Sequence, residues 1–286
     1  MMTKFINKII KILFLRNPVD VFLGRIFFGN DSSFRKNLQG KLALKNNRIS
    51  SKINISNDSL YFKKNGFVKA KKIVPINEIQ KLREKFIYEI SCVTDWKKNL
   101  RYDFTSLNNP NFFKKFSEVK NIFNDKMCKI LEDYYNGYFK VTNVHIYRII
   151  KNQNSSLEDV RSYGSTIAWH NDGSRSDSVK IFVALDKIDE NSGPMEFVSK
   201  KETKNIFRKY PFIFSKINLA NKINNMDCKK KMTFFGNEAY FINTNLCLHR
   251  AQSPNTTHRD LLVYYCQSSK SPFNFDWEKV STENIY

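Results

Sequence analysis

Two residues of the metal-binding kind stand two positions apart in this sequence. His170 and Asp172 directly follow Thr166–Trp169, a short segment typical of a strand. In an extended chain the side chains at positions i and i+2 point to the same side, so this imidazole and this carboxylate could chelate one ion. A His-x-Asp pair is also common by chance. A surface turn at residues 171–173 with one capped histidine is therefore the alternative.

A second imidazole follows another predicted strand end. His249 comes after Phe241–Thr244 and is one of only four histidines in 286 residues. Two imidazoles and one carboxylate on one face of an ion form the facial triad of non-haem iron(II) oxygenases, which leaves metal positions open. The three residues therefore make oxygen chemistry on iron a candidate function.

An arginine in the same region could hold an anionic ligand. Arg259 lies ten residues beyond His249, at the start of the predicted strand 261–265. Its planar guanidinium would hold a carboxylate through two parallel hydrogen bonds, which a lysine would do less specifically. The alternative is that Arg259 is one of many surface cations, since the chain has 48 lysines and arginines.

These residues need elements that position them, and the patterning predicts helices first and strands later. A turn is expected at Asn65–Gly66, followed by a strand, and a helix is expected after Pro75 because apolar residues recur there at spacings of three and four. The same spacing predicts a second helix over residues 119–131. High β-propensity predicts five strands, at residues 141–150, 166–169, 179–185, 239–244 and 261–266. The order predicts a mainly β fold, an antiparallel double sheet buttressed by helices.

Composition limits the other classes of function. Hydrophobic residues make up 41% of the chain, which predicts a buried core rather than a disordered chain. The net charge of +21 favours an anionic partner, but the lysines are spread along the whole chain, so we do not expect nucleic-acid binding. The five cysteines contain no CxxC pair, which indicates a reducing compartment and no thiolate zinc site.

The N-terminal residues form a separate pattern. Residues 4–16 predict a basic amphipathic helix, which would either contact an anionic membrane or pack on protein. No run of apolar residues is long enough for a membrane span. Residues 29–59 are polar and predict a loose linker. We therefore divide the chain into an extension, residues 1–58, and a domain, residues 59–286, and expect residues 1–28 to be dispensable for folding.

The chain resembles the phytanoyl-CoA dioxygenase (PhyH-like) family, most specifically in the second half of the matching region. The resemblance covers about residues 60–270 and rests on motifs that occur in the family's order: Trp169–Asp172, Ala184–Asp186, Glu190–Met195, Gly236–Phe241, His249–Ala251, Pro254–Asn255 and Arg259. It implies a double-stranded β-helix, which is a jelly-roll, cupin-like barrel. The cofactors that it implies are Fe(II) and, as a co-substrate used with O2, 2-oxoglutarate.

The resemblance also implies roles for individual residues. His170, Asp172 and His249 would be the iron ligands, and Arg259 would hold the distal carboxylate of 2-oxoglutarate. Phe182 stands where several relatives have a tryptophan that lines the co-substrate pocket. The family often has Pro-Gly-Ser-His where this chain has Phe197–Lys200, so relatives do not identify its substrate.

The implied reaction is oxidative decarboxylation of 2-oxoglutarate to succinate and CO2, coupled to oxidation of a small-molecule or lipid-linked substrate. Halogenating relatives replace the carboxylate ligand by a small residue, so Asp172 favours hydroxylation or desaturation. One alternative is a noncatalytic binding protein that keeps the barrel and associates with a membrane. Another is a hydrolytic zinc protein with the same ligands. We expect a cytoplasmic location, with peripheral membrane contact if residues 4–16 bind lipid.

Two further histidines, His145 and His258, lie outside the ligand set that the resemblance implies. His145, on the predicted strand 141–150, would either line the substrate pocket or be a buried structural residue. His258 is expected in an exposed loop.

Overall fold

The structure is a computed structural model, which describes residues 18–49, 55–93, 101–107, 109–151, 167–213, 216–255 and 258–282. The predicted amphipathic helix at residues 4–16 lies outside these ranges.

A large antiparallel sheet forms the centre of the molecule. Its strand order is β1-β7-β4-β9-β3-β2, and a second sheet has the order β6-β5-β8. The strands of the large sheet are β1 (Phe67–Ala70), β2 (Arg101–Thr105), β3 (Tyr138–Ile150), β4 (Val179–Ala184), β7 (Ala239–Ile242) and β9 (His258–Ser269). Those of the small sheet are β5 (Glu196–Phe197), β6 (Lys230–Lys231) and β8 (His249–Arg250).

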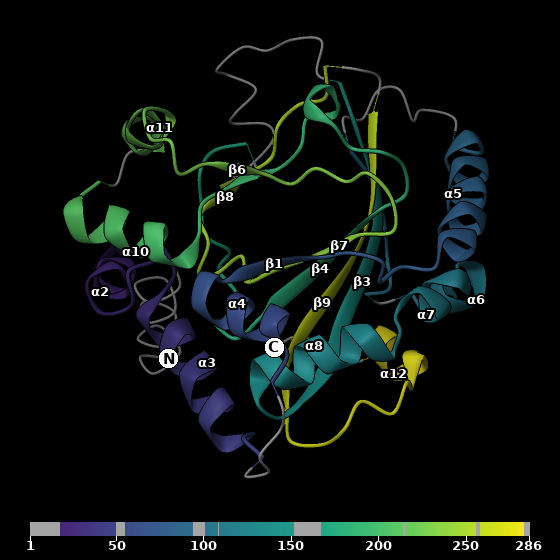
Figure 1. The fold of residues 1–286 in the computed structure, drawn as a ribbon, viewed down its shortest axis with the longest axis horizontal. Coiled ribbons are helices and arrows are strands. Elements are labelled where there is room, and N and C mark those ends of the chain that lie inside the picture. The colour runs from purple at the N-terminus through teal and green to yellow at the C-terminus, as the bar shows by residue number, and fades with distance from the viewer. Residues whose placement is uncertain are drawn as a thin grey trace, which may run out of the picture.

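Helices cover one face of the large sheet, and the small sheet lies across from the other face (Figure 1). The covering helices are α5 (Ile76–Ser91), α6 (Phe112–Lys115), α7 (Glu118–Ile122), α8 (Asp125–Tyr135) and α12 (Trp277–Thr282). Helix α4 (Asn57–Asn65) lies beside α8, because its Phe62 stacks on Tyr134 and belongs to the core beneath the covering helices. On the side of the small sheet lie α2 (Pro18–Phe28), α10 (Lys200–Lys209) and α11 (Lys216–Asn224), and α3 (Phe34–Asn46) packs against α2. The 3-10 helix η3 (Glu190–Ser192) lies in the loop between β4 and β5.

Strand alternation divides the apolar residues of the large sheet between two cores. Ile181 and Val183 of β4 pack with Leu82 and Phe86 of α5 in the core beneath the helices. Phe182, between them in sequence, points to the opposite face and packs in a second core. Because side chains alternate along a strand, the second face is the one that can carry a site between the two sheets.

Several predicted elements are confirmed. Helix α5 follows Pro75 and buries Leu82, Phe86 and Ile90. Gly66 ends α4 with a φ of 79°, in the left-handed region, and a Cβ there would lie 2.7 Å from the Cys247 sulfur. Only glycine fits that turn without strain, so the Asn65–Gly66 turn sets where β1 begins.

Other expectations were wrong. The helix expected over residues 119–131 is divided into α7 and α8, because the Asn124 side chain accepts hydrogen bonds from the Lys126 and Met127 amides and begins a new helix. Residues 167–169 are not a strand, and His258 begins β9 with a half-buried side chain rather than lying in a loop.

The middle of the predicted linker is also structured. Residues 34–46 form α3, whose first turn is capped by Ser33, and α3 buries only Asn37 and Gly40. A helix with so few buried apolar residues shows no amphipathic pattern in sequence. The boundary between residues 58 and 59 stays a prediction.

Candidate metal centre and its cavity

The structure brings His170, Asp172 and His249 together. One potential ligand atom from each lies within 4.8 Å of the others. The Asp172 Oδ1 atom is 3.8 Å from His170 Nε2 and 3.7 Å from His249 Nε2. Two ring nitrogens therefore face one carboxylate oxygen, which is the arrangement that an ion between the three would require.

Backbone pairing joins the two histidines. His170 and His249 form an antiparallel bridge in which each amide donates to the other carbonyl at 3.0 Å. Their ring centroids lie 4.3 Å apart. Since 78 residues separate them in sequence, this bridge is the feature that places the second imidazole beside the His-x-Asp pair.

Hydrogen bonds fix which nitrogen of each ring faces the site. His170 Nδ1 donates to the Ala168 carbonyl at 2.8 Å, and His249 Nδ1 donates to the Cys247 carbonyl at 3.1 Å. A neutral imidazole that donates through Nδ1 presents an unprotonated Nε2, which is the metal-binding form. Both rings are thus set up to bind an ion through Nε2.

Electrostatics keep His249 and Asp172 in the states that metal binding requires. Burial lowers the pKa of His249 to about 4, together with the nearby His170 and Lys180, and Asp172 only partly opposes this. Burial alone would raise the pKa of Asp172, but Lys180 and His249 hold it well below its ordinary value. At neutral pH the site therefore offers a neutral imidazole and a carboxylate.

Lys180 is a site residue that was not predicted. Its ammonium lies 2.6 Å from Asp172 Oδ2, the carboxylate oxygen that does not face the histidines. Its pKa is held above the ordinary value by Asp172 despite its burial. A signal was present in the sequence: Lys180 interrupts the apolar strand Val179–Ala184 and, two positions before Phe182, shares its face.

The segment between α2 and α3 supports the turn that carries Asp172. The Ser32 hydroxyl donates to the Asp172 carbonyl at 2.6 Å, and the Asp31 amide donates to the Asn171 side chain at 2.8 Å. Arg25 of α2 pairs with Asp31 at 2.6 Å. Part of the predicted extension therefore contacts the candidate site, which sequence patterning did not indicate.

A cavity of about 140 Å³ opens beside the triad. Its walls include His170, Asp172 and His249, and also the predicted residues Arg259 and Phe182. Phe182 lies on the cavity face opposite Val263 of β9 and Tyr240 of β7. All five predicted site residues thus reach one cavity, although they come from β4, β8, β9 and a loop.

Arg259 is a buried cation without an acidic partner among the described residues. Its side chain is 3% exposed, Nη1 donates to the Gln252 carbonyl at 3.3 Å, and Nε has no hydrogen-bond partner. Burial lowers its pKa to about 10, with repulsion from Arg101 as a further cause. A buried guanidinium of this kind is costly unless an anion completes it, so the cavity fits a ligand with a carboxylate.

His145 does not line the cavity in the described structure, although it lies on the same face of the sheet. Its Nδ1 atom is 2.8 Å from Asp103 Oδ1. Arg148 lies on the other face of the sheet, where it is paired with Asp260 at 2.7 Å, and it is not among the described residues that line the cavity. Cys247 and Cys266 are buried free cysteines.

Comparison with known proteins gives structural likeness only. No family model matches the sequence, and no curated protein matches it. The structure is similar to that of HygX from Streptomyces hygroscopicus with nickel and 2-oxoglutarate bound, with a TM-score of 0.53, 14% identity, and coverage of 76% of this chain and 88% of that one.

Two further solved structures are similar. EctD from S. alaskensis, in its apoform, has a TM-score of 0.53 and 11% identity over 77% of this chain and 80% of that one. The non-haem α-ketoglutarate-dependent carbocyclase SnoK from nogalamycin biosynthesis has a TM-score of 0.50 and 11% identity over 77% of this chain and 88% of that one. At these identities the likeness establishes a shared fold.

Proposed function

We propose that this protein is an Fe(II)- and 2-oxoglutarate-dependent oxygenase that hydroxylates or desaturates a small-molecule or lipid-linked substrate. The observation that supports this most strongly is the convergence of two imidazole Nε2 atoms on one oxygen of Asp172, beside the buried cation Arg259. The shared fold with HygX, whose structure holds nickel and 2-oxoglutarate, supports the same cofactor and co-substrate. We further propose that the two sheets are the two sides of a PhyH-like double-stranded β-helix.

In this proposal each residue has a defined task. His170, Asp172 and His249 would hold Fe(II) on one face, and the metal with bound 2-oxoglutarate would supply the oxidising chemistry with O2. Arg259 would bind the distal carboxylate of 2-oxoglutarate and so orient it. Phe182 would pack against its carbon chain. Lys180 would keep one oxygen of Asp172 occupied, so that the other stays turned to the metal.

The cavity residues argue against the hydrolytic zinc alternative. Such an enzyme needs a general base near the metal-bound water. Among the described residues that line the cavity, Asp172 is the only acid, and it is engaged by Lys180. Arg259 would moreover have no task in that mechanism.

The decisive experiment measures iron and 2-oxoglutarate turnover together. The purified protein should bind one Fe(II) and decarboxylate 2-oxoglutarate slowly without substrate. His170→Ala and Asp172→Ala should abolish both, because each removes one of three ligands. Full iron occupancy in the His170→Ala protein would refute the ligand assignment. Iron binding without any turnover would instead favour the noncatalytic binding protein.

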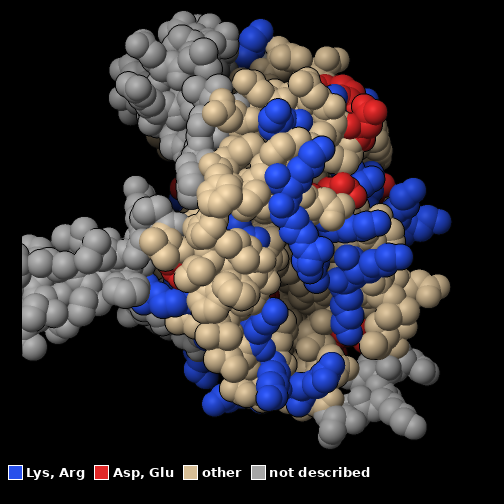
Figure 2. All heavy atoms as spheres, turned by 90° about the vertical axis from the view of Figure 1, so that its left-hand side faces the viewer, with Lys and Arg blue, Asp and Glu red and all other residues tan. Residues whose placement is uncertain are grey.

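We also propose that the side carrying α2, α3, α4 and α10 contacts an anionic membrane. Lysines and arginines gather on this side (Figure 2). Exposed apolar side chains lie on the same helices, including Phe27 on α2, Leu42 on α3 and Leu60 on α4, which are 64%, 49% and 51% exposed. Apolar residues among cations suit the headgroup region of an anionic bilayer, and residues 4–16 would add to this surface.

This contact would be peripheral. Within the described ranges, every helix is too short or too polar to cross a bilayer. We propose a location at the inner face of the membrane, which liposome sedimentation tests.

A further inference from the structure

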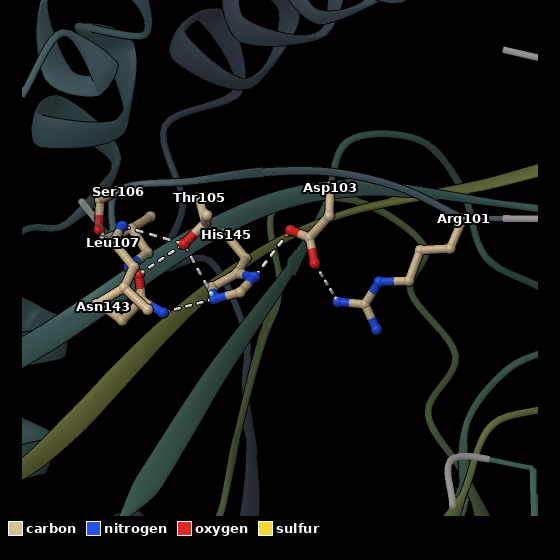
Figure 3. Close-up of polar contacts among 8 residues, drawn as sticks. Arg101, Asp103, Thr105, Ser106, Leu107, Asn143 and His145 are labelled. Atoms are coloured by element: carbon tan, nitrogen blue, oxygen red, sulfur yellow. Dashed lines mark hydrogen bonds and ion pairs between the residues drawn. The ribbon is translucent and has the colours of Figure 1, made fainter. Parts of the chain in front are cut away.

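A second polar cluster lies on the cavity face of the large sheet, at its edge. Arg101, Asp103 and Thr105 alternate along β2, the edge strand, and lie opposite Ile149, Tyr147 and His145 of β3 (Figure 3). Tyr147 and Ile149 line the cavity beside the triad, and so does Arg101. The cluster therefore adjoins the proposed iron site without belonging to the ligand set.

A chain of hydrogen bonds runs through the cluster, and the first bonds determine which atom donates in each later one. Asn143 Oδ1 accepts from the Thr105 and Ser106 hydroxyls at 3.0 and 2.9 Å, which fixes the orientation of its amide. The Asn143 Nδ2 group then lies 2.5 Å from His145 Nε2, so it donates to that nitrogen. His145 must in turn donate from Nδ1 to Asp103 Oδ1, at 2.8 Å. The other oxygen of Asp103 accepts from Arg101 Nη2 at 2.7 Å.

The residue types are those of a hydrolytic triad, but the bonds do not make one. A nucleophilic Thr105 would have to donate its proton to His145 Nε2. That nitrogen lies 3.3 Å from the Thr105 hydroxyl and already accepts from Asn143, whereas the hydroxyl donates to Asn143 Oδ1. The network holds Asp103 in place instead.

What Asp103 holds is a guanidinium at the rim of the cavity. Arg101 packs over the ring of Tyr147, with its Cζ atom 4.2 Å from the ring centroid. Its only hydrogen-bond partner among the described residues is Asp103, reached through Nη2, so Nε and Nη1 remain available to a ligand. A fork fixed by stacking and by a carboxylate is pre-organised for a planar or tetrahedral anion.

Two arginines thus flank Ile149 on the cavity face. Arg101 of β2 and Arg259 of β9 both lie opposite Ile149 of β3, two strand spacings or about 10 Å apart. Arg259 is 3% exposed, whereas the side chain of Arg101 is 39% exposed. The deep cation suits a co-substrate that binds first, and the rim cation suits a group that enters afterwards.

We propose that Arg101 determines specificity by binding a carboxylate or phosphate group of the primary substrate. The apolar part of that substrate would lie against Ile149, Ile150 and Met195 of the cavity wall. Asp103 and His145 are positioning residues that act through Arg101. This inference rests on the proposed function, because it assigns Arg259 to 2-oxoglutarate.

The test compares anionic and neutral probes of equal shape. The probe pairs are octanoate with octanamide, and hexyl phosphate with hexanol. Their affinities are measured by calorimetric titration of two forms of the protein. One form is loaded with Fe(II) and 2-oxoglutarate in the absence of oxygen, and the other is metal-free. The wild-type protein should bind one of the anions at least about tenfold more tightly than its neutral partner. The pair that shows the preference distinguishes carboxylate from phosphate.

Arg101→Gln should remove that preference while leaving 2-oxoglutarate affinity within about twofold. The matched control is Arg83→Gln, since Arg83 of α5 is also a half-exposed guanidinium paired with an aspartate, Asp186 at 2.8 Å, but lies outside the cavity. Arg101→Lys keeps the charge without the fork. It should retain a reduced preference, and it replaces the glutamine variant if that variant does not fold.

Three results would overturn the inference. The wild-type protein could show no preference for the anion, or Arg101→Gln could keep the wild-type preference. Arg101→Gln could also lose binding of 2-oxoglutarate while it still binds the anionic probe. Failure of the proposed function has a different signature. The wild-type protein would then bind neither Fe(II) nor 2-oxoglutarate, and the titrations of the metal-free protein would still decide whether Arg101 selects anions.

Discussion

Replacing Arg259 should have opposite effects on folding and on ligand binding. The guanidinium is buried without an acidic partner among the described residues, and burial lowers its pKa from the ordinary arginine value to about 10. The guanidinium is charged at pH 7 in both the folded and the unfolded chain, so the whole penalty for burying the charge lowers the free energy of unfolding at that pH. A pKa difference of this size corresponds to about 3 kcal/mol of lost stability.

Arg259→Met keeps an unbranched side chain of similar length and removes the charge. The free energy of unfolding of the ligand-free protein should therefore rise, by at most about 3 kcal/mol, less the value of the hydrogen bond to Gln252. The same variant should bind 2-oxoglutarate about 30- to 1,000-fold more weakly, since it lacks a charge-assisted pair worth about 2–4 kcal/mol. A group that costs stability and supports binding is typical of a ligand site.

Urea denaturation with and without 2-oxoglutarate, in the presence of Mn(II), measures both effects. At a concentration 100 times the dissociation constant, 2-oxoglutarate should stabilise the wild-type protein by about 2.7 kcal/mol and the variant by much less. Arg83→Met is the control, because the exposed pair of Arg83 with Asp186 should change stability by no more than about 0.5 kcal/mol. A variant that is destabilised without ligand and still stabilised by 2-oxoglutarate would refute the reasoning and make Arg259 a structural residue.

Three further predictions concern the site and its surroundings. Because burial lowers the pKa of His249 to about 4, the unfolded chain binds a proton between pH 6.5 and pH 4 that the folded chain does not. The free energy of unfolding of the metal-free protein should therefore fall by about 3 kcal/mol as the pH decreases from 6.5 to 4. His249→Gln should flatten this pH dependence in urea denaturation, and an unchanged pH dependence would assign it to other groups. Lys180→Met leaves the Asp172 carboxylate without its ion pair, which should lower the stability of the metal-free protein by about 3–5 kcal/mol. Mn(II) should restore part of this stability in a thermal melt. Equal melting temperatures of the wild-type protein and the variant without metal would contradict this prediction. A chain that begins at residue 18 should keep uncoupled 2-oxoglutarate turnover but sediment less with acidic liposomes than the full chain. A chain that begins at residue 59 should lose turnover, because it lacks Ser32 and Asp31, which support the turn that carries Asp172. Full turnover by the chain that begins at residue 59 would show that this support is unnecessary.

Local patterning predicted the elements that carry the site. The apolar spacing after Pro75 marks α5, and the apolar, β-branched runs mark β3, β4, β7 and β9. His249 comes after the run that forms β7, and the i, i+2 spacing of the His-x-Asp pair made a shared metal site predictable. These features depend on neighbours along the chain, so the sequence alone contains them.

Where the local signal was weak, the prediction failed. Helix α3 buries Asn37 and Gly40 in place of an apolar stripe, so its residues were expected to be a linker. The Asn124 cap that divides residues 119–131 into two helices was overlooked because the apolar spacing continues across it. Both features rest on polar contacts, which hydrophobic periodicity does not register.

The sequence by itself therefore determined the residue types, four strands of the large sheet (β3, β4, β7 and β9) and the three candidate ligands, whereas the tertiary structure decided how they meet. The bridge between His170 and His249 and the position of Arg101 beside Ile149 depend on backbone pairing between segments that are far apart in the chain, and the pairing of Lys180 with Asp172 depends on how the loop that carries Asp172 lies against β4. Register is set by long-range pairing and packing, and a shift of one residue in β2 would turn Arg101 to the other face of the large sheet. The physical reason is that spacing along one strand fixes which side chains share a face, but only the pairing of strands fixes which side chains face one another.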